Sequence, residues 1–332
     1  MSSGVADLRL VHGFDAGLTR IGAARSFVYR DAEDSLVEDA ATLQRIAALA
    51  IPPAWRDVWI AADPSAHLQA TGIDARGRKQ YRYHAQWVHA RDELKFHDME
   101  AFGRAQPALR AQIADELARE AGVGHARVLA LSLRLLDVGL FRVGSDRYAR
   151  ENHHYGLTTL QRSQVLVREG QAVFDYVGKA GKRQRLAIAD ADAVPVLATL
   201  RRRRSGPAEL MAFRGPRGWT RIHGEDVNNF LRSLSGGPFS AKEYRTWNAT
   251  VIAATGLAAE RPTAARAAAV ASRMAADALG NTPTVARQAY IDPRVFERYA
   301  EGSVVELGGL AGDPWQARER VERRVLELLA AR

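Results

Sequence analysis

Hydrophobic and polar residues alternate in three short runs near the start of the chain, at residues 57–60, 67–71 and 79–83. Alternation with a period of two places one set of side chains on each face of a strand, so each run predicts a β-strand. A helical repeat precedes them and ends near Ala50, where residues 51–55 (Ile-Pro-Pro-Ala-Trp) interrupt the period. Residues 1–88 are therefore predicted to form a small β-sheet domain at the N-terminus.

Helical spacing takes over from about residue 90. Leu109, Ile113 and Leu117 recur every four residues in a helix that Pro107 is expected to open and Gly122 to end. Residues 128–138 are apolar on nearly every side, which predicts a helix at a core. Further helices are expected from Ala191 to Arg204, from Asp226, from Ser240 to a stop at Gly256, from Ala264 to Ala278, and from Asp313.

A second β-sheet is expected inside this helical region. The runs at residues 163–167, 172–177 and 184–188 have strand periodicity and are separated by glycine-containing turns, so they predict a three-stranded antiparallel sheet. The predicted fold class is α+β, with a mainly α-helical domain over residues 89–332 that carries this sheet. Lys179 lies at the tip of the second hairpin, where it is either a solvated charge or a proton donor to a phosphate oxygen of a ligand.

Length and composition narrow the class of protein. A chain of 332 residues exceeds the size of one ordinary hydrophobic core, which favours two domains. Its 47 Lys and Arg against 38 Asp and Glu give a net charge of +9, which favours nucleic acid as partner over an anionic membrane surface. With no Cys and nine scattered His residues, we expect no disulfide and no metal site. No signal segment, spanning run or nucleotide P-loop is present, so we expect a cytoplasmic protein that binds no nucleotide and no membrane.

Cations and aromatic rings are interleaved on the last strand of the first domain. Lys79, Tyr81 and Tyr83 share one face of the run at 79–83, while Arg82 points to the other. A sugar-phosphate backbone is bound by charge neutralisation together with flat surfaces for its sugars. These four residues are therefore candidate DNA contacts, and the alternative is a half-buried edge strand with solvated charges.

Polar residues follow the buried run at 128–138 directly. Among them Arg142 is either the structural partner of a carboxylate such as Asp146 or a clamp for an anion. Ser145 and Tyr148 are further candidate DNA contacts in the same stretch. The sequence alone leaves both interpretations of Arg142 open.

The stretch at residues 279–293 places a tyrosine between two helices. Asn281 is expected to cap a short helix that ends at Tyr290, and Asp292 with a following proline then stops the helix. A tyrosine there can present its hydroxyl as a nucleophile, or it can pack its ring and leave the oxygen in water. Arg245 falls in the first turn of another predicted helix, near the positive end of the dipole.

Four short segments, in this order and spacing, resemble the active-site signatures of the type IB DNA topoisomerases, in the short poxvirus-like form found in bacteria. They are Phe-Arg-Val-Gly at 141–144, Asp-Tyr-Val-Gly-Lys at 175–179, Tyr-Arg-Thr-Trp-Asn-Ala-Thr at 244–250 and Arg-Gln-Ala-Tyr-Ile-Asp-Pro at 287–293. Residues 51–55 and 77–84 are similar to the same family's first domain, so the resemblance covers essentially the whole chain. Each motif alone is weak, whereas the ordered set is specific.

The resemblance implies an enzyme that relaxes supercoiled duplex DNA without ATP or another cofactor. Tyr290 would form a 3′-phosphotyrosyl intermediate, one strand would rotate, and the nick would then reseal. Arg142 and Arg245 would hold the non-bridging oxygens, and Lys179 would protonate the leaving 5′ oxygen. Asn281 stands where many members of the family carry His, so it would stabilise the phosphate by a hydrogen bond without acting as an acid or base.

The family also implies a C-shaped clamp, in which a monomer closes its two domains around DNA and associates with the nucleoid. Tyrosine recombinases and integrases are the main alternative, because they share the tyrosine chemistry. They usually carry His three residues before the second arginine, where this chain has Lys242, and commonly have a helical first domain. A non-catalytic architectural protein would explain the charge but not the ordered set of residues.

Overall fold

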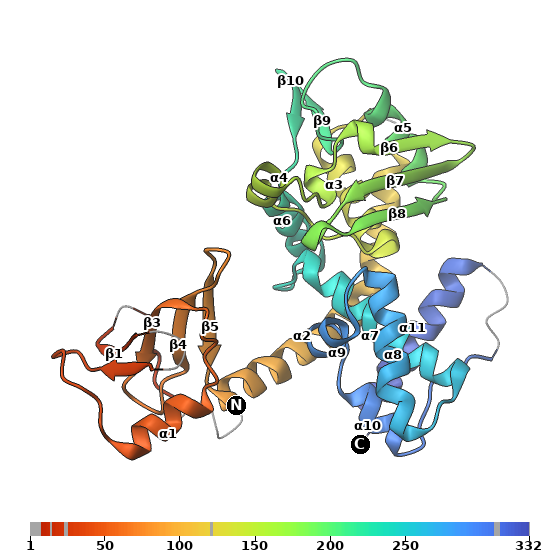
Figure 1. Ribbon diagram of the computed structural model, residues 1–332. Coiled ribbons are helices and arrows are strands. Elements are labelled where there is room, and N and C mark those ends of the chain that lie inside the picture. Colours follow the sequence, from red (N-terminus) through yellow and green to blue (C-terminus); the bar gives the residue numbers. More distant parts are fainter. Residues whose placement is uncertain (1–7, 14, 23–25, 120–121, 309–312, 332) are drawn as a thin grey trace. The chain divides into compact units, whose positions relative to one another are not determined.

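The computed structural model describes residues 8–13, 15–22, 26–119, 122–308 and 313–331 (Figure 1). The chain divides into two compact units, Met1–His97 and Asp98–Arg332. The division lies within the long helix α2 (Ala85–Ala118), and so does the boundary expected after residue 88.

The first unit is built on a five-stranded antiparallel sheet with the strand order β2-β1-β3-β4-β5. The strands are β1 (Gly17–Ile21), β2 (Val28–Arg30), β3 (Arg56–Ala61), β4 (Leu68–Ile73) and β5 (Lys79–Tyr83). The helix α1 (Ala40–Ala48) lies between β2 and β3 in the chain, and its Ile46 packs into the core with Leu18, Val58 and Ile60. The β-sheet prediction for this part of the chain is confirmed, although the pattern of alternation did not identify β1 and β2.

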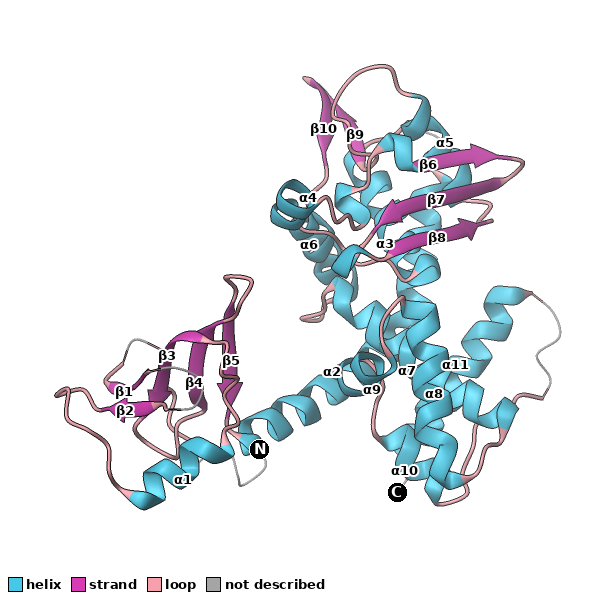
Figure 2. Cartoon of the chain, in the orientation of Figure 1, coloured by secondary structure: helices cyan, strands magenta, loops and turns pink. Residues whose placement is uncertain are grey.

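The second unit is mainly helical and carries a three-stranded antiparallel sheet, as Figure 2 shows. Its strands are β6 (Val165–Arg168), β7 (Gln171–Val177) and β8 (Arg183–Ile188), and a separate hairpin consists of β9 (Ala212–Gly215) and β10 (Gly218–Arg221). Besides part of α2, the helices are α3 (His125–Gly139), α4 (Asp146–Asn152), α5 (Ala193–Arg202), α6 (Gly224–Ser235), α7 (Ala241–Glu260), α8 (Ala264–Leu279), α9 (Pro283–Ala289), α10 (Arg294–Ala300) and α11 (Pro314–Ala330). The α+β fold class is confirmed.

Helix α3 is the central helix of the second unit. Its residues 128–137 are all buried, in agreement with the uninterrupted apolar pattern of this segment. It packs against α5, α6 and α7 and against strand β8. The helix ends at Leu140, which adopts a left-handed conformation (φ 51°) and turns the chain toward Arg142.

Pro107 does not open a helix, contrary to the prediction, but lies inside α2. A proline in a helix interior removes one backbone hydrogen bond and crowds the preceding turn, at a cost of about 3 kcal/mol. Buried residues anchor the helix on both sides of it, since Phe102, Leu109 and Ile113 are at most 2% exposed. Burial of these side chains outweighs the local cost, so the helix continues.

The predicted stop of α7 at Gly256 is also wrong, because the helix continues to Glu260. A Cβ atom added to Gly256 would lie 2.4 Å from the sulfur of Met274 on α8. The glycine therefore allows α7 and α8 to approach closely rather than ending α7. The helix ends instead at Arg261, which takes a left-handed conformation (φ 43°).

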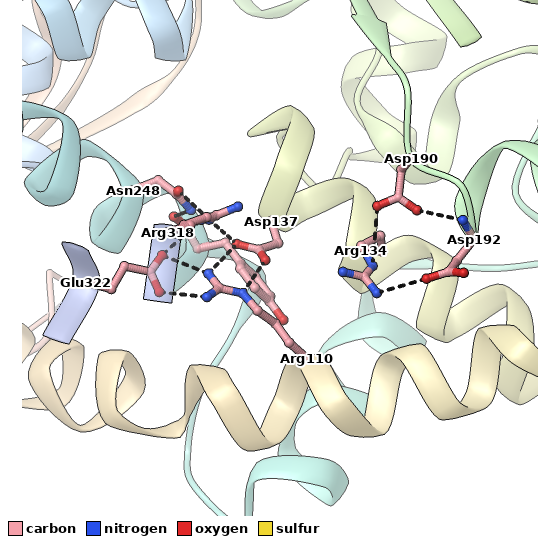
Figure 3. Close-up of polar contacts among 9 residues, drawn as sticks. Arg110, Arg134, Asp137, Asp190, Asp192, Asn248, Arg318 and Glu322 are labelled. Carbon is pink, nitrogen blue, oxygen red and sulfur yellow. Dashed lines mark hydrogen bonds and ion pairs between the residues drawn. The ribbon is translucent and has the colours of Figure 1, made fainter. Parts of the chain in front are cut away.

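A buried cluster of charged side chains joins α2, α3, α7 and α11 (Figure 3). Arg110 of α2 donates to Asp137 of α3 at 2.8 Å and to Glu322 of α11 at 2.7 Å. These three side chains are at most 6% exposed. Arg318 of α11 extends the cluster to Asn248 of α7 at 2.8 Å. Loss of any partner would leave a charge unpaired in the interior, so the cluster ties the four helices together.

Candidate active site

Tyr290 lies in the connection between α9 and α10. Its backbone N–H donates to the Ala286 carbonyl at 3.0 Å, so Tyr290 closes α9. Thr250 of α7 holds the same segment, because its hydroxyl lies 3.3 Å from the Tyr290 carbonyl and accepts from the Asp292 N–H at 3.0 Å. Asp292 is fully buried and pairs with Arg294 at 2.8 Å. The backbone around the tyrosine is thus anchored on both sides.

The cap of α9 is Thr282, and the prediction that Asn281 fills this position is wrong. The Thr282 hydroxyl accepts from the Val285 N–H at 3.4 Å. Proline fits the first position of a helix, so Pro283 makes the residue directly before it the cap. This leaves the side chain of Asn281 available for another partner.

That partner is Arg142, which connects Asn281 with Tyr290. One guanidinium nitrogen of Arg142 donates to the Tyr290 hydroxyl at 3.2 Å, and another donates to the side-chain oxygen of Asn281. The alternative expectation, a pair between Arg142 and Asp146, is wrong, because Asp146 pairs with Arg221 of β10 instead. Arg142 therefore faces the tyrosine.

Arg245 is the fifth residue of α7, and it is only 4% exposed. Its guanidinium donates to the carbonyls of Leu140, after α3, and of Leu279, at the end of α8, the latter at 2.9 Å. The guanidinium carbon lies 5.3 Å from the centroid of the Tyr290 ring. The remaining Nε is buried and has no partner among the described residues, so a donor is left for a ligand.

A cleft of about 140 Å³ is lined by Arg142, Lys179 and Arg245. Lys179 lies in the short turn Lys179–Gly181 between β7 and β8, which is the predicted hairpin tip. Its side chain is exposed, and no carboxylate of the described chain forms an ion pair with it. The ammonium group is thus available to a ligand in the cleft.

The hairpin that carries Lys179 is docked onto the segment that carries Asn281. The Lys182 ammonium donates to the Asn281 carbonyl at 3.2 Å. Gln184 fills the space beside Gly280, where an added Cβ would lie 2.5 Å from its side-chain oxygen. These contacts bring Lys179 and Asn281, which are far apart in the sequence, to neighbouring parts of one site.

The two arginines change the acidity of the tyrosine. Burial alone would raise the pKa of the Tyr290 hydroxyl, but the positive charges of Arg142 and Arg245 outweigh burial and lower the pKa below 10. Burial and repulsion by Arg142 lower the pKa of Arg245 to about 10, which keeps this guanidinium charged at neutral pH. The arrangement favours a phenolate oxygen next to two cations, as a nucleophile that attacks an anionic phosphate requires.

The candidate DNA contacts of the first unit form an exposed row on the edge strand β5. Tyr81 is 49% exposed and Tyr83 is 36% exposed. Their rings stack with centroids 6.1 Å apart, and the Lys79 ammonium lies 6.0 Å from the Tyr81 ring. Arg82 faces the other way, over the Trp55 ring at 6.0 Å. We call Lys79, Tyr81 and Tyr83 the β5 stripe.

The candidate DNA contacts of the second unit lie at α4. Ser145 is the residue before the helix, and its side chain makes no capping hydrogen bond. Tyr148 is 51% exposed on the helix. Both side chains are thus accessible to a ligand that runs along α4.

No group of three or more His, Asp or Glu side chains in the described part of the chain has an arrangement that could hold a metal ion. None of its helices is both long enough and apolar enough to cross a membrane.

Comparison with known proteins covers both units. Residues 81–303 match the family model of the eukaryotic DNA topoisomerase I catalytic core, and residues 26–74 match that of the bacterial DNA topoisomerase IB N-terminal domain. A DNA topoisomerase 1B of Acanthamoeba polyphaga mimivirus is 28% identical over 295 residues, which span 85% of this chain and 87% of that protein. The five candidate catalytic residues all lie within the first matched range.

Proposed function

The chain belongs to the type IB DNA topoisomerases, and from this premise we propose that it relaxes supercoiled duplex DNA through a transient bond between Tyr290 and a 3′ phosphate. One observation carries the proposal. Arg142 donates to the Tyr290 hydroxyl at 3.2 Å, and Arg245 lies 5.3 Å from the ring of the same tyrosine. One fixed cation at the phenol oxygen and a second beside its ring suit a nucleophile for a phosphodiester.

In the proposed reaction the Tyr290 oxygen, having lost its proton, attacks the phosphorus of one strand and the bond to the 5′ oxygen breaks. Lys179 gives its proton to that oxygen, which leaves as a 5′ hydroxyl. The energy of the broken bond is kept in the phosphotyrosine link. After rotation of the free strand, the 5′ hydroxyl returns its proton to Lys179 and attacks the link, which expels Tyr290 and reseals the DNA without ATP.

Arg142 and Arg245 hold the two non-bridging oxygens of the phosphate in this proposal. A guanidinium stays charged and presents paired donors that match the geometry of phosphate. Carbonyls at the ends of α3 and α8 hold Arg245 in place before DNA arrives. Such preorganised donors stabilise charge as it builds up in the transition state, because they need no rearrangement at that moment.

Asn281 supplies a further neutral donor to the same phosphate. Its side-chain oxygen accepts from Arg142, while its side-chain nitrogen is buried and has no partner among the described residues. A buried donor without an acceptor is costly unless a ligand satisfies it. An amide neither gains nor loses a proton near neutral pH, so Asn281 stabilises the phosphate without acting as an acid or base.

The substrate is duplex DNA, and both units contact it in this proposal. The β5 stripe of the first unit and Ser145 and Tyr148 of the second unit bind its backbone, while the monomer closes around the duplex. Arginine, lysine, tyrosine and asparagine supply every role in the chemistry. The proposed reaction therefore requires no cofactor and no metal.

Plasmid relaxation without ATP or Mg²⁺ tests the function against its alternatives. A topoisomerase produces the full ladder of relaxed forms from any supercoiled plasmid. A recombinase acts only on DNA that contains its own sites, and an architectural protein leaves the linking number unchanged once protein is removed. Failure to relax any plasmid would overturn the proposal.

The variant Tyr290→Phe tests the nucleophile. It should abolish relaxation and the covalent adduct seen on a denaturing gel, because only the reacting oxygen is lost. Non-covalent binding of duplex DNA should remain within about twofold of the unsubstituted protein, since the phosphate contacts persist. An adduct formed by this variant would assign the nucleophile to another residue.

A further inference from the structure

Tyr176 lies in the wall of the cleft that is also lined by Arg142, Lys179 and Arg245. It is the next-to-last residue of β7 and is 8% exposed, on the face of the strand that is buried together with Phe174. Its ring stacks on Phe141, with centroids 6.0 Å apart and planes 22° apart. Phe141 directly precedes Arg142, so the arginine and this ring are positioned by the same packing contact.

The hydroxyl end of Tyr176 points toward the hairpin tip. The ring carbon next to the hydroxyl-bearing carbon lies 3.7 Å from the position that a Cβ atom on Gly178 would occupy. Gly178 directly precedes Lys179, and both line the cleft together with Tyr176. No hydrogen bond of the Tyr176 hydroxyl is found among the described residues, so this donor is available to a ligand.

Tyr176 and the candidate nucleophile Tyr290 differ in acidity. Burial raises the pKa of Tyr176 to about 12, although Arg245 and Arg142 act to lower it. The Tyr290 hydroxyl, which Arg142 contacts directly, has a lowered pKa. At neutral pH Tyr176 therefore keeps its proton, which makes it a hydrogen-bond donor and a poor nucleophile.

We propose that the Tyr176 hydroxyl is an additional catalytic group, which donates a hydrogen bond to a non-bridging oxygen of the scissile phosphate. This inference rests on the proposed function and adds one residue to the site. A neutral donor at this position stabilises the charge that develops on phosphorus without adding to the repulsion among Arg142, Lys179 and Arg245. Loss of one preorganised donor of this kind slows catalysis by about 10²-fold to 10³-fold.

The test compares Tyr176→Phe with a matched variant, Tyr244→Phe. The Tyr244 hydroxyl is also buried and unpaired among the described residues, and its burial raises its pKa, but it does not line the cleft. Covalent adduct formation is followed in a single turnover at saturating duplex oligonucleotide. We expect Tyr176→Phe to form the adduct about 10² to 10³ times more slowly, and Tyr244→Phe to keep the rate of the unsubstituted protein.

A second substrate separates the possible roles of the hydroxyl. When sulfur replaces the bridging 5′ oxygen, the leaving group departs without an acid, but the non-bridging oxygens still need donors. Tyr176→Phe should therefore be equally slow on both substrates, with unchanged DNA affinity and thermal unfolding.

Four results would overturn the inference. Tyr176→Phe could form the adduct at the normal rate on the ordinary substrate, or it could regain the normal rate on the sulfur substrate. Its slower rate could also be explained by weaker DNA binding or by lower stability of the variant. If the unsubstituted protein forms no adduct, the proposed function fails as well, so the two failures are distinguishable.

Discussion

Tyr290 is subject to two opposing influences, and their balance sets the pH at which it becomes a nucleophile. Burial raises the pKa of its hydroxyl, whereas the charges of Arg142 and Arg245 lower it and prevail. Loss of a neighbouring positive charge raises the pKa of a phenol. In a plot of cleavage rate against pH, we therefore expect Arg142→Ala to move the rising limb to higher pH. The same variant should slow cleavage by about 10² to 10³.

Single-turnover cleavage measured from neutral pH to above the ordinary phenol pKa of about 10 follows both effects. Arg119→Ala is the matched control, since Arg119 directly follows α2, is 70% exposed and pairs with Glu116. It should keep the profile of the unsubstituted protein. An Arg142→Ala profile with an unshifted rising part would show that this arginine does not set the acidity of Tyr290.

Single residues of the site differ in how far the sequence identifies them. Arg142 and Tyr290 could be selected as candidates because each belongs to a short motif in an ordered set. Thr250 and Tyr176 were missed as site residues, because their contacts join segments that only the tertiary fold brings together. Asn281 was assigned to the wrong local role, since asparagine and threonine are both good caps and only the position of the following proline decides between them.

The hairpin of β7 and β8 is an element whose placement determines what Lys179 can do. The contact of Lys182 with the Asn281 carbonyl at 3.2 Å and the packing of Gln184 on Gly280 fix the hairpin beside the end of α8. If Lys179 is the general acid, Lys179→Ala should slow cleavage of an ordinary phosphodiester by about 10² to 10⁴. On DNA with sulfur at the bridging 5′ position, the cleavage rate of Lys179→Ala should be much closer to that of the unsubstituted protein, because a thiolate leaves without a proton.

Arg142→Ala is the control for this experiment, and it should stay impaired on the sulfur substrate, because the non-bridging oxygens still need a cation. Equal defects of Lys179→Ala on both substrates would contradict the acid role. Lys179 would then be only a charge at the hairpin tip that positions the phosphate.

Helix α11 is tied to the rest of the second unit by the buried cluster in Figure 3. Arg110→Met removes the guanidinium that pairs with both Asp137 and Glu322 and leaves those carboxylates in the interior. We expect a loss of roughly 3 to 5 kcal/mol in the free energy of unfolding, as for other broken buried pairs. Urea denaturation followed by far-UV circular dichroism measures the loss, because the helices give most of that signal.

Arg147→Met serves as the matched control for stability. Its ion pair with Glu151 is solvent-exposed, with side-chain exposures of 77% and 55%, so its loss should cost less than about 1 kcal/mol. Equal effects of Arg110→Met and Arg147→Met would mean that the buried cluster contributes no more than a surface pair.

Helix ends were less predictable from the sequence than helix positions. Pro107 and Gly256 are both strong local signals for a boundary, and in both cases the helix continues. Burial of Phe102 and Leu109 outweighs the proline, and the close contact with Met274 explains the glycine. Local propensity is a weak constraint where tertiary packing acts on the same residues.

Across the whole molecule, the change from strand to helical periodicity near residue 90 predicted a β-sheet part followed by a mainly helical part. The structure divides after His97, inside a helix that the sequence pattern had split at Pro107. The short strands β1 and β2 were missed because few residues alternate in them; β2 has only three. The net charge of +9 predicts the kind of partner but not the surface that binds it.

The last prediction locates part of that surface in the first unit. DNA binding should weaken steeply with salt, and each lost phosphate contact should reduce the slope of log affinity against log salt by about 0.9. Lys79→Ala removes the cation of the β5 stripe and should lower the slope by about this amount. Arg30→Ala removes the same charge from β2, at the opposite edge of the sheet, and should leave the slope unchanged.

Both variants should cleave at the normal rate with saturating DNA, because neither residue lies in the catalytic unit. Equal slopes for the two variants would contradict a DNA contact at Lys79, and a slope near zero for the unsubstituted protein would contradict binding through phosphates altogether.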